Sequence, residues 1–446
     1  MIQWHVKAEC IRREYQRSSG SIMSKCQADP GVTEGRPTEY YGSSLITENE
    51  FSLRWIVWFS ICLIPCSLPG GYSVNYLFAL TPIFYIIAGG KIHKLPILLK
   101  LLAVLSILIF VVATLYQVEF QNYFLRRLVS FILFMTMFSM AFINISNKMI
   151  NSFLVALVIV SIGLAGNSIF SFFALGLSED SGLAKESIGS QRTGYLYIIA
   201  FWVVVDWLFC HGRSLLLYKL LMLSVAMTIL FGLILTFSRS SFVALAFSLP
   251  VFLWVYRKQL SLFSKSGLQR IIVIALVFVF GFFIISVRFP TIFDFVDQRL
   301  ISLLVSGEMV ERLGTSNTSE GTRIVIWTEV ASFVFSNPIT GSGFLGSWVL
   351  GSAEGVALGS AHNQYVDVFL RLGVLGFLLY IIIHYRLMIF LLKNNKPLFV
   401  GFMGVIAYGV FHETFKDSQG AVVFAFLLAY YSTVIRSVKK QKAGTH

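Results

Sequence analysis

The chain has 446 residues, of which 56% are hydrophobic and only 13% are charged, and its formal net charge is +13. A soluble globular protein of this size carries far more charged surface, so the composition indicates an integral membrane protein. The apolar runs do not alternate with polar residues, as the short strands of a membrane β-barrel would, and we therefore expect helices.

The predicted helices follow from the length of the apolar runs, because a helix needs about 20 such residues to cross the hydrocarbon core. Twelve runs approach or reach this length, which predicts an all-α membrane protein with about twelve transmembrane helices. In chain order the runs cover residues 54–69, 72–89, 96–115, 127–146, 150–176, 195–211, 214–236, 241–256, 271–288, 368–390, 397–412 and 419–436.

The positive charge is distributed unevenly among the segments that join these runs. With the N-terminus inside, 23 of the 35 basic residues fall in inner segments, ten fall in outer segments, and Lys100 and Arg371 lie within predicted spans. Basic residues favour the cytoplasmic side, so we expect twelve crossings with both termini in the cytoplasm. The same bias explains the basic charge without a nucleic-acid partner.

The segments outside the spans divide the chain into five parts. Residues 1–53 are polar, carry no apolar core typical of a signal peptide, and are predicted to form a disordered cytoplasmic tail, in which Met23 is a possible start. Residues 54–288 hold spans one to nine, residues 368–436 hold spans ten to twelve, and residues 437–446 form a basic cytoplasmic tail. The long segment 289–367 is predicted to lie on the outer side.

That outer segment does not have the composition of a disordered linker. "TIFDFVDQRLISLL" and "RIVIWTEVASFVF" place apolar residues at helical spacing, and "SNPITGSGFLGS" then breaks the helix with Pro338, Gly341 and Gly343. We expect helices that lie against the membrane surface and cap a site, although a loop without such a role remains an alternative.

Three residues predicted to lie on the outer side are candidates for substrate binding or catalysis. Arg239 lies in the turn "TFSRSSF", Arg192 precedes the sixth span in "SQRTGYLY", and His362 lies where the outer segment returns to the membrane. A guanidinium matches phosphate oxygens, and a neutral imidazole accepts a proton at neutral pH. The alternatives are that Arg239 reaches lipid headgroups, that Arg192 is solvated and that His362 is structural.

Five cysteines are scattered through the tail and the spans, without the histidine or carboxylate partners of a metal site. We therefore predict no disulfide, no metal site and no cofactor.

Two stretches in order carry a resemblance to a known family. They are "GTRIVIWTEVASFVFSNPITGSGFLGS" and "AHNQYVDVFLRLGVLGF", with Trp327, Asn337-Pro338, Gly341 and Gly343 in the first and His362-Asn363, Tyr365, Gly373 and Gly376 in the second. The pattern resembles the O-antigen ligase and polymerase superfamily of bacterial membrane glycosyltransferases. One departure is at Leu370 and Arg371, where many members carry an acidic residue.

The resemblance implies a GT-C-like enzyme of the bacterial inner membrane that transfers a saccharide from a polyprenyl diphosphate to an acceptor hydroxyl, with inversion and without a metal. His362 would be the general base, and Arg192 and Arg239 would hold the diphosphate. Asn363, Glu320, Arg323 and Asp367 would position the acceptor or the loop, and Asp367 could also orient the imidazole. The acceptor would be a lipid A core for a ligase, or a growing exopolysaccharide or O-antigen chain for a polymerase.

Two other functions compete with this interpretation. A transporter or flippase would bury ionisable residues near the bilayer centre, where Asp206 is the main candidate, and a scaffold would need no chemistry at all. The polar residues instead gather on one face, which favours a reaction at the membrane surface.

Overall fold

The computed structural model describes residues 52–64, 74–175, 193–210, 216–236, 238–259, 319–350, 361–414 and 418–443. Within these ranges the chain is all-helical and contains no strand, which confirms the predicted class. The α-helices are α2 (Leu53–Leu63), α3 (Thr81–Ile87), α4 (Ile97–Tyr116), α5 (Phe124–Thr136), α6 (Asn147–Leu175), α8 (Gly194–Cys210), α9 (Leu216–Leu235), α10 (Arg239–Tyr256), α15 (Ser319–Ser336), α16 (Gln364–Asn394), α17 (Lys396–Gly409) and α18 (Ser418–Ala443). Short 3-10 helices include η2 (Val74–Leu80), η3 (Val118–Tyr123), η4 (Ser139–Phe142) and η7 (Gly346–Val349).

The helices fall where hydropathy places them. Eleven of the twelve predicted runs coincide with helices, and the run at 271–288 lies outside the described residues. Six helical stretches are long and apolar enough to cross a membrane, and five further apolar helices are shorter. The chain is therefore a multi-pass membrane protein, while the count of twelve crossings stays a prediction. The helix predicted around 323–335 is present as α15, and "TIFDFVDQRLISLL" lies outside the described residues.

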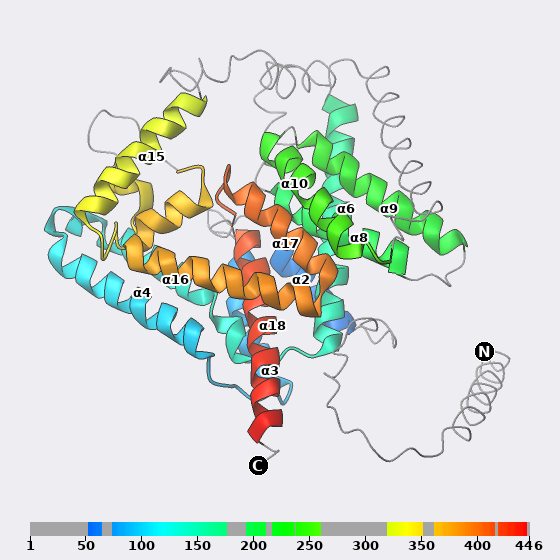
Figure 1. The fold of residues 1–446 in the computed structure, drawn as a ribbon, viewed down its shortest axis with the longest axis horizontal. Helices are drawn as coiled ribbons and strands as arrows, with labels where there is room; N and C mark the ends of the chain where they lie inside the picture. The colour runs from blue at the N-terminus through cyan, green and yellow to red at the C-terminus, as the bar shows by residue number, and fades with distance from the viewer. Residues whose placement is uncertain are drawn as a thin grey trace, which may run out of the picture. The chain divides into compact units, whose positions relative to one another are not determined.

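Small residues bring the central helices close together. Helix α17 packs against both α8 and α10, and α9 packs against α8 and α6 (Figure 1). A Cβ added at Gly401 would come within 2.9 Å of the Cα of Ile199, and one added at Gly232 within 2.9 Å of the Cα of Ala165. In lipid, where helices gain little from hydrophobic burial, such close backbone approach is a main source of packing energy.

Helix α16 is broken near its start, at Gly373, where φ is 64° and ψ is −169°. In an unbroken helix the N–H of Val374 would donate to the carbonyl of Leu370. Here the Val374 N–H donates to Pro338 O at 2.9 Å, and Leu370 O accepts from the Ser342 N–H at 2.7 Å. The turn at 337–344 therefore satisfies both backbone groups that the break releases.

The fit between turn and break leaves no room for side chains at two glycines. A Cβ at Gly373 would lie 2.6 Å from Pro338 O and 2.8 Å from Ile339 O, and a Cβ at Gly341 would meet Leu370 O. Both glycines have positive φ, which only glycine adopts readily. The glycine-rich turn predicted from the sequence is thus a backbone clamp on α16.

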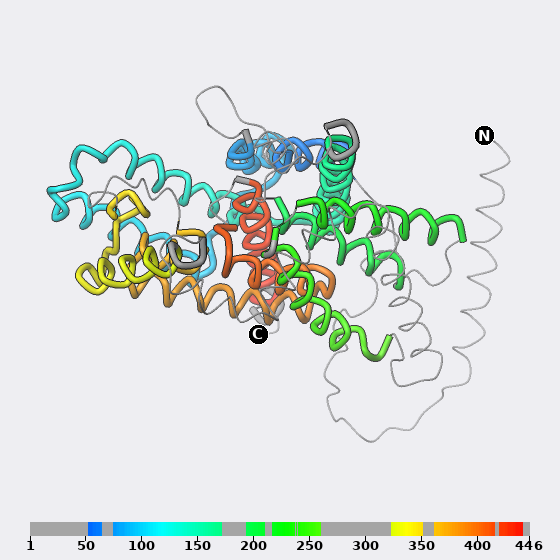
Figure 2. Tube along the Cα trace, turned by 90° about the horizontal axis from the view of Figure 1, so that it is seen from above, coloured from blue at the N-terminus to red at the C-terminus, as the bar shows by residue number. Residues whose placement is uncertain are grey.

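A buried arginine holds the other side of this turn. Arg127 of α5 is 1% exposed and donates to Ala113 O at 2.7 Å and to Gln117 Oε1 at 2.8 Å. Gln117 in turn donates its amide to Gly341 O at 2.7 Å. This chain of hydrogen bonds connects α4 and α5 to the turn, so α4, α15 and α16 gather on one side of the bundle (Figures 1 and 2).

We expect Gly373→Ala to destabilise the protein, because its backbone conformation alone costs an ordinary residue about 1–3 kcal/mol and the new Cβ meets two carbonyls. Gly163→Ala in α6 is the matched control, since a Cβ there has nothing within 4 Å and helix propensity favours alanine. Thermal unfolding in detergent should show a lower Tm for Gly373→Ala only. Equal Tm values would contradict the proposed clamp.

Candidate functional site

His362 directly precedes Asn363, the N-cap of α16, and has an unusual backbone conformation. Its side chain is exposed, and its φ is 50°, in the left-handed region that a histidine enters only when its surroundings hold it there. The neighbouring residues on both sides are buried, with Ala361 at 0% and Asn363 at 6% exposure. The chain thus buries the flanks of His362 and presents its imidazole at the surface.

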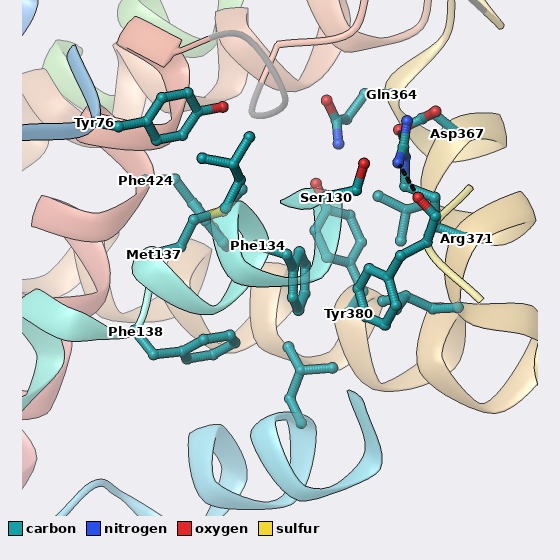
Figure 3. A pocket seen from close by; sticks show the side chains of 15 residues that line it. Tyr76, Ser130, Phe134, Met137, Phe138, Gln364, Asp367, Arg371, Tyr380 and Phe424 are labelled. Atoms are coloured by element: carbon teal, nitrogen blue, oxygen red, sulfur yellow. Dashed lines mark hydrogen bonds and ion pairs between the residues drawn. The ribbon is translucent and has the colours of Figure 1, made fainter. Parts of the chain in front are cut away.

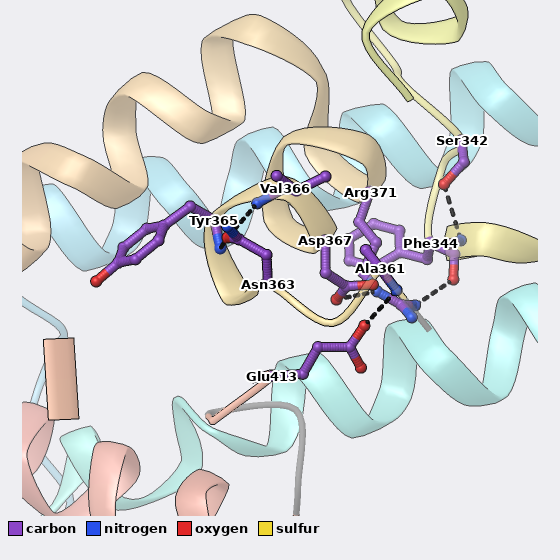
Figure 4. A network of polar contacts seen from close by, with 10 residues as sticks. Ser342, Phe344, Ala361, Asn363, Tyr365, Val366, Asp367, Arg371 and Glu413 are labelled. Carbon is purple, nitrogen blue, oxygen red and sulfur yellow. Dashed lines mark hydrogen bonds and ion pairs between the residues drawn. The ribbon is translucent and has the colours of Figure 1, made fainter. Parts of the chain in front are cut away.

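Two side chains from distant segments hold the residue before His362. The Ala361 N–H donates to Glu413 Oε1 at 2.9 Å, and Ala361 O accepts from Trp327 Nε1 at 2.9 Å. Figure 4 shows the contact between Glu413 and Ala361. Glu413 follows α17 and Trp327 belongs to α15, so the two contacts come from different parts of the fold. Together they fix both backbone groups of Ala361 and the peptide that leads into His362.

The residues after His362 are held just as firmly. Asn363 is the N-cap of α16, and its Oδ1 accepts from the N–H groups of Tyr365 at 2.9 Å and Val366 at 3.1 Å. The Tyr365 hydroxyl donates to Ile406 O of α17 at 2.8 Å. Asn363 therefore holds the start of α16 in place. A role of Asn363 in positioning the acceptor stays a prediction.

The second half of the site lies at the starts of α8 and α10. Arg239 is the first residue of α10, and the serines around it are buried and linked, with Ser238 Oγ 2.5 Å from Ser240 Oγ and Thr236 Oγ1 donating to Ser241 Oγ at 3.2 Å. Arg192 lies outside the described residues. A Cβ added at Gly194, in the first turn of α8, would meet the Ser241 hydroxyl and the Tyr408 ring. The start of α8 therefore lies beside the start of α10.

Helix α17 connects the two halves. Its Tyr408 contacts Gly194, while a Cβ on Gly409 would come within 3.4 Å of the Gln364 Cβ. The N-terminal ends of α8, α10 and α16 thus gather around the C-terminal end of α17. A helix N-terminus carries partial positive charge, so this arrangement favours an anion.

The remaining predicted residues divide between α15 and α16. Glu320 and Arg323 lie in the first turns of α15, where Arg323 is half-buried and the Glu320 side chain lies outside the described part. Asp367 is 2% exposed and pairs with Arg371, with Nε 2.7 Å from Oδ2. Arg371 also donates to Phe344 O at 2.8 Å. The sequence interpretation left Arg371 inside a span without a role, although its i, i+4 spacing from Asp367 was a usable signal.

A cavity of about 220 Å³ lies beside this ion pair (Figure 3). Most of its lining is aromatic or aliphatic, and the polar groups come chiefly from α16. The lining residues are Tyr76, Leu102, Ser130, Leu133, Phe134, Met137, Phe138, Phe344, Gln364, Asp367, Val368, Arg371, Leu372, Tyr380 and Phe424. Sequence reasoning did not find this cavity, because its walls come together only in the folded chain. The described residues contain no group of three or more histidine, cysteine or acidic residues placed to bind a metal.

The comparison with protein families gives a match to one part of the chain. Residues 223–381, from α9 to the second segment of α16, match the family model described as O-antigen ligase. The match covers 159 of the 446 residues, and this region is therefore similar to the O-antigen ligase family. The matched range contains Arg239, Glu320, Arg323, His362 and Asp367, while Arg192 lies outside it. No curated protein matches the chain.

We expect Trp327→Phe to slow glycosyl transfer about threefold to tenfold, because it removes the hydrogen bond from Trp327 Nε1 to Ala361 O and keeps an aromatic ring. Glu413→Gln should retain more activity than Glu413→Ala, since a glutamine oxygen can still accept from the Ala361 N–H. Trp254→Phe on the exposed face of α10 is the matched control. Transfer rates per mole of purified protein test this prediction. A fully active Trp327→Phe protein would exclude a role in transfer for the contact between Trp327 and Ala361.

Proposed function

We propose that the chain is a glycosyltransferase that moves a saccharide from a polyprenyl diphosphate to an acceptor hydroxyl, with His362 as general base. The observation that carries the proposal is the left-handed, exposed His362 held between Trp327, Glu413 and the α16 N-cap. The match of residues 223–381 to the O-antigen ligase family supports a glycosyltransferase-type enzyme with lipid-linked saccharide and acceptor partners.

The reaction needs a proton acceptor and an anion site on opposite sides of the anomeric carbon. The neutral imidazole of His362 takes the proton from the acceptor hydroxyl as its oxygen attacks that carbon. The bond to the diphosphate oxygen breaks, the electron pair leaves with the diphosphate, and the configuration at the carbon inverts. Arg239 and Arg192 stabilise the departing anion, together with the N-termini of α8 and α10.

In this proposal the site faces the outside of the bacterial inner membrane, with both termini in the cytoplasm and residues 289–367 as the catalytic outer segment. The donor arrives by diffusion of its lipid carrier in the bilayer, so the base belongs at the interface where His362 precedes α16. The acceptor is a lipid A core for a ligase or the growing chain for a polymerase. Neighbouring genes for lipid A core synthesis would favour the first, and a flippase with a chain-length regulator the second.

The placement of Asp206 does not favour a transporter. Asp206 lies in the last part of α8 and accepts from the Tyr256 hydroxyl at 2.5 Å, and Tyr256 ends α10 close to Lys396, which begins α17. These positions are at the opposite end of the helices from His362 and Arg239. Asp206 is thus beside a helix end and not at the middle of the bundle, where transport sites are expected.

Removal of the proposed base gives the direct test. His362→Ala should lower transfer by about 10²- to 10⁴-fold, the usual contribution of general-base catalysis, while the protein still accumulates and binds the lipid-linked donor. His93→Ala is the control, because His93 contacts Asn144 at the other end of the fold. Transfer and donor binding should be measured on one preparation. Wild-type turnover by His362→Ala across neutral pH would reject His362 as the base and turn attention to Glu320 and Asp367.

The proposed anion site predicts a difference between two basic side chains at one position. Arg239→Lys keeps the charge and loses the planar fork, so activity should fall well below wild type, and Arg239→Ala should fall further. Arg192→Ala should also be impaired. Arg257→Lys, at the other end of α10, is the control because that residue is exposed. A fully active Arg239→Ala enzyme would mean that this arginine only contacts lipid headgroups.

A further inference from the structure

The cavity beside α16 has two unlike walls. In Figure 3 the side chains of Gln364, Asp367 and Arg371 lie on one side, and Met137, Phe138 and Phe424 lie on the other. Gln364 is two residues from His362, so the polar wall begins next to the proposed base. The break at Gly373 separates the segment that carries Gln364 from the segment that carries Tyr380, and both segments line this one cavity.

The polar wall carries no surplus charge of its own. Arg371 is neutralised by Asp367 at 2.7 Å, and a second nitrogen of its guanidinium is engaged by Phe344 O. A phosphate gains little from a guanidinium that already faces a carboxylate. Donors and acceptors in a neutral wall suit hydroxyl groups, which both donate and accept.

Tyr380 brings a hydroxyl group to the cavity wall. The residue is 2% exposed and lines the cavity, and its hydroxyl makes no hydrogen bond of good geometry to the described residues, although the Gln364 side chain lies near it. Buried hydroxyl groups in native proteins are nearly always hydrogen-bonded. A phenylalanine would fill the same space without this cost.

We propose that the cavity binds one sugar ring of the saccharide substrate, with Tyr380 and Gln364 bonding to its hydroxyls and aromatic side chains such as Phe134 packing on its apolar face. This inference rests on the proposed function and adds a saccharide subsite to it. The volume of about 220 Å³ is below the 300–1,000 Å³ typical of pockets for drug-sized ligands, so it suits a single ring. A hydrocarbon chain would leave the Tyr380 hydroxyl unsatisfied.

The ring can belong to the donor or to the acceptor, and protection from chemical labelling distinguishes them. In a chain whose native cysteines are replaced, Ser130→Cys places a half-buried thiol on the cavity wall, and a small methanethiosulfonate reagent reports its accessibility. Three probes are compared: lipid-linked saccharide extracted from the host membranes, the same extract with its sugars removed by mild acid, and methyl glycosides of the sugars of the host polysaccharide.

Protection by the intact lipid-linked saccharide alone assigns the cavity to the donor sugar, and protection by the methyl glycosides assigns it to the acceptor. Equal protection by the stripped lipid would mean that a hydrocarbon chain fills the cavity, and no protection by any probe would mean that it is no substrate site. Either of the last two results overturns the proposal.

Tyr380→Phe refines the test by removing one hydroxyl. The probe concentration that gives half-maximal protection should rise about threefold to tenfold, as expected for one lost hydrogen bond. Tyr430→Phe, which packs on Phe390 away from the cavity, should leave it unchanged. An unchanged value for Tyr380→Phe would exclude its hydroxyl from sugar binding.

The labelling experiment does not need turnover, and this separates it from the proposed mechanism. If His362→Ala is active and sugars still protect Ser130→Cys from labelling, His362 is not the general base but the cavity is still a sugar subsite. If His362→Ala loses activity and no sugar protects Ser130→Cys, His362 keeps its proposed role and the cavity is not a sugar subsite.

Discussion

The break in α16 at Gly373 is the constraint on which the surroundings of His362 depend. Within a bilayer each backbone N–H and C=O must find a partner inside the protein, so a broken helix needs another segment to complete it. The turn at 337–344 does this through Pro338 O and the Ser342 N–H. The shape of that turn requires glycine at two positions, and Arg127 and Gln117 then hold it from the side of α4 and α5. The separation of the first turns of α16 from the rest of that helix follows from these contacts.

Once the first segment of α16 is set apart, the residues before it can be held independently of the long helix. Asn363 caps the segment, Tyr365 attaches it to α17, and Trp327 and Glu413 fix Ala361. Each of these side chains holds the backbone in place, whereas the side chain of His362 is exposed. A surface histidine in a left-handed conformation costs free energy, and the surrounding contacts supply it. This division between holding residues and one presented residue is the pattern expected of a catalytic side chain.

The sequence predicts the helices well and the site only in part, for physical reasons. Apolar runs predict membrane helices because the bilayer sets their length, and eleven runs are helical. Gly341 and Gly343 indicate a turn, but nothing in the sequence says that its partner is the break at Gly373. Asp367 and Arg371 are four residues apart and could have been paired by spacing. Glu413 is 52 residues from Ala361, and Tyr380 meets Gln364 across a helix break, so only the fold brings these together.

Arg127 and Arg371 show why charge alone does not identify a substrate site. Arg127 donates to Ala113 O and Gln117, and Arg371 donates to Asp367 and Phe344 O, so both forks are used to hold the protein together. Burying an arginine in a membrane protein is costly, and carbonyl or carboxylate partners offset that cost. An arginine that binds a diphosphate must instead keep its fork available until the substrate arrives. Arg239 meets the positional requirement, because it begins α10 beside the start of α8, where the helix N-termini favour an anion.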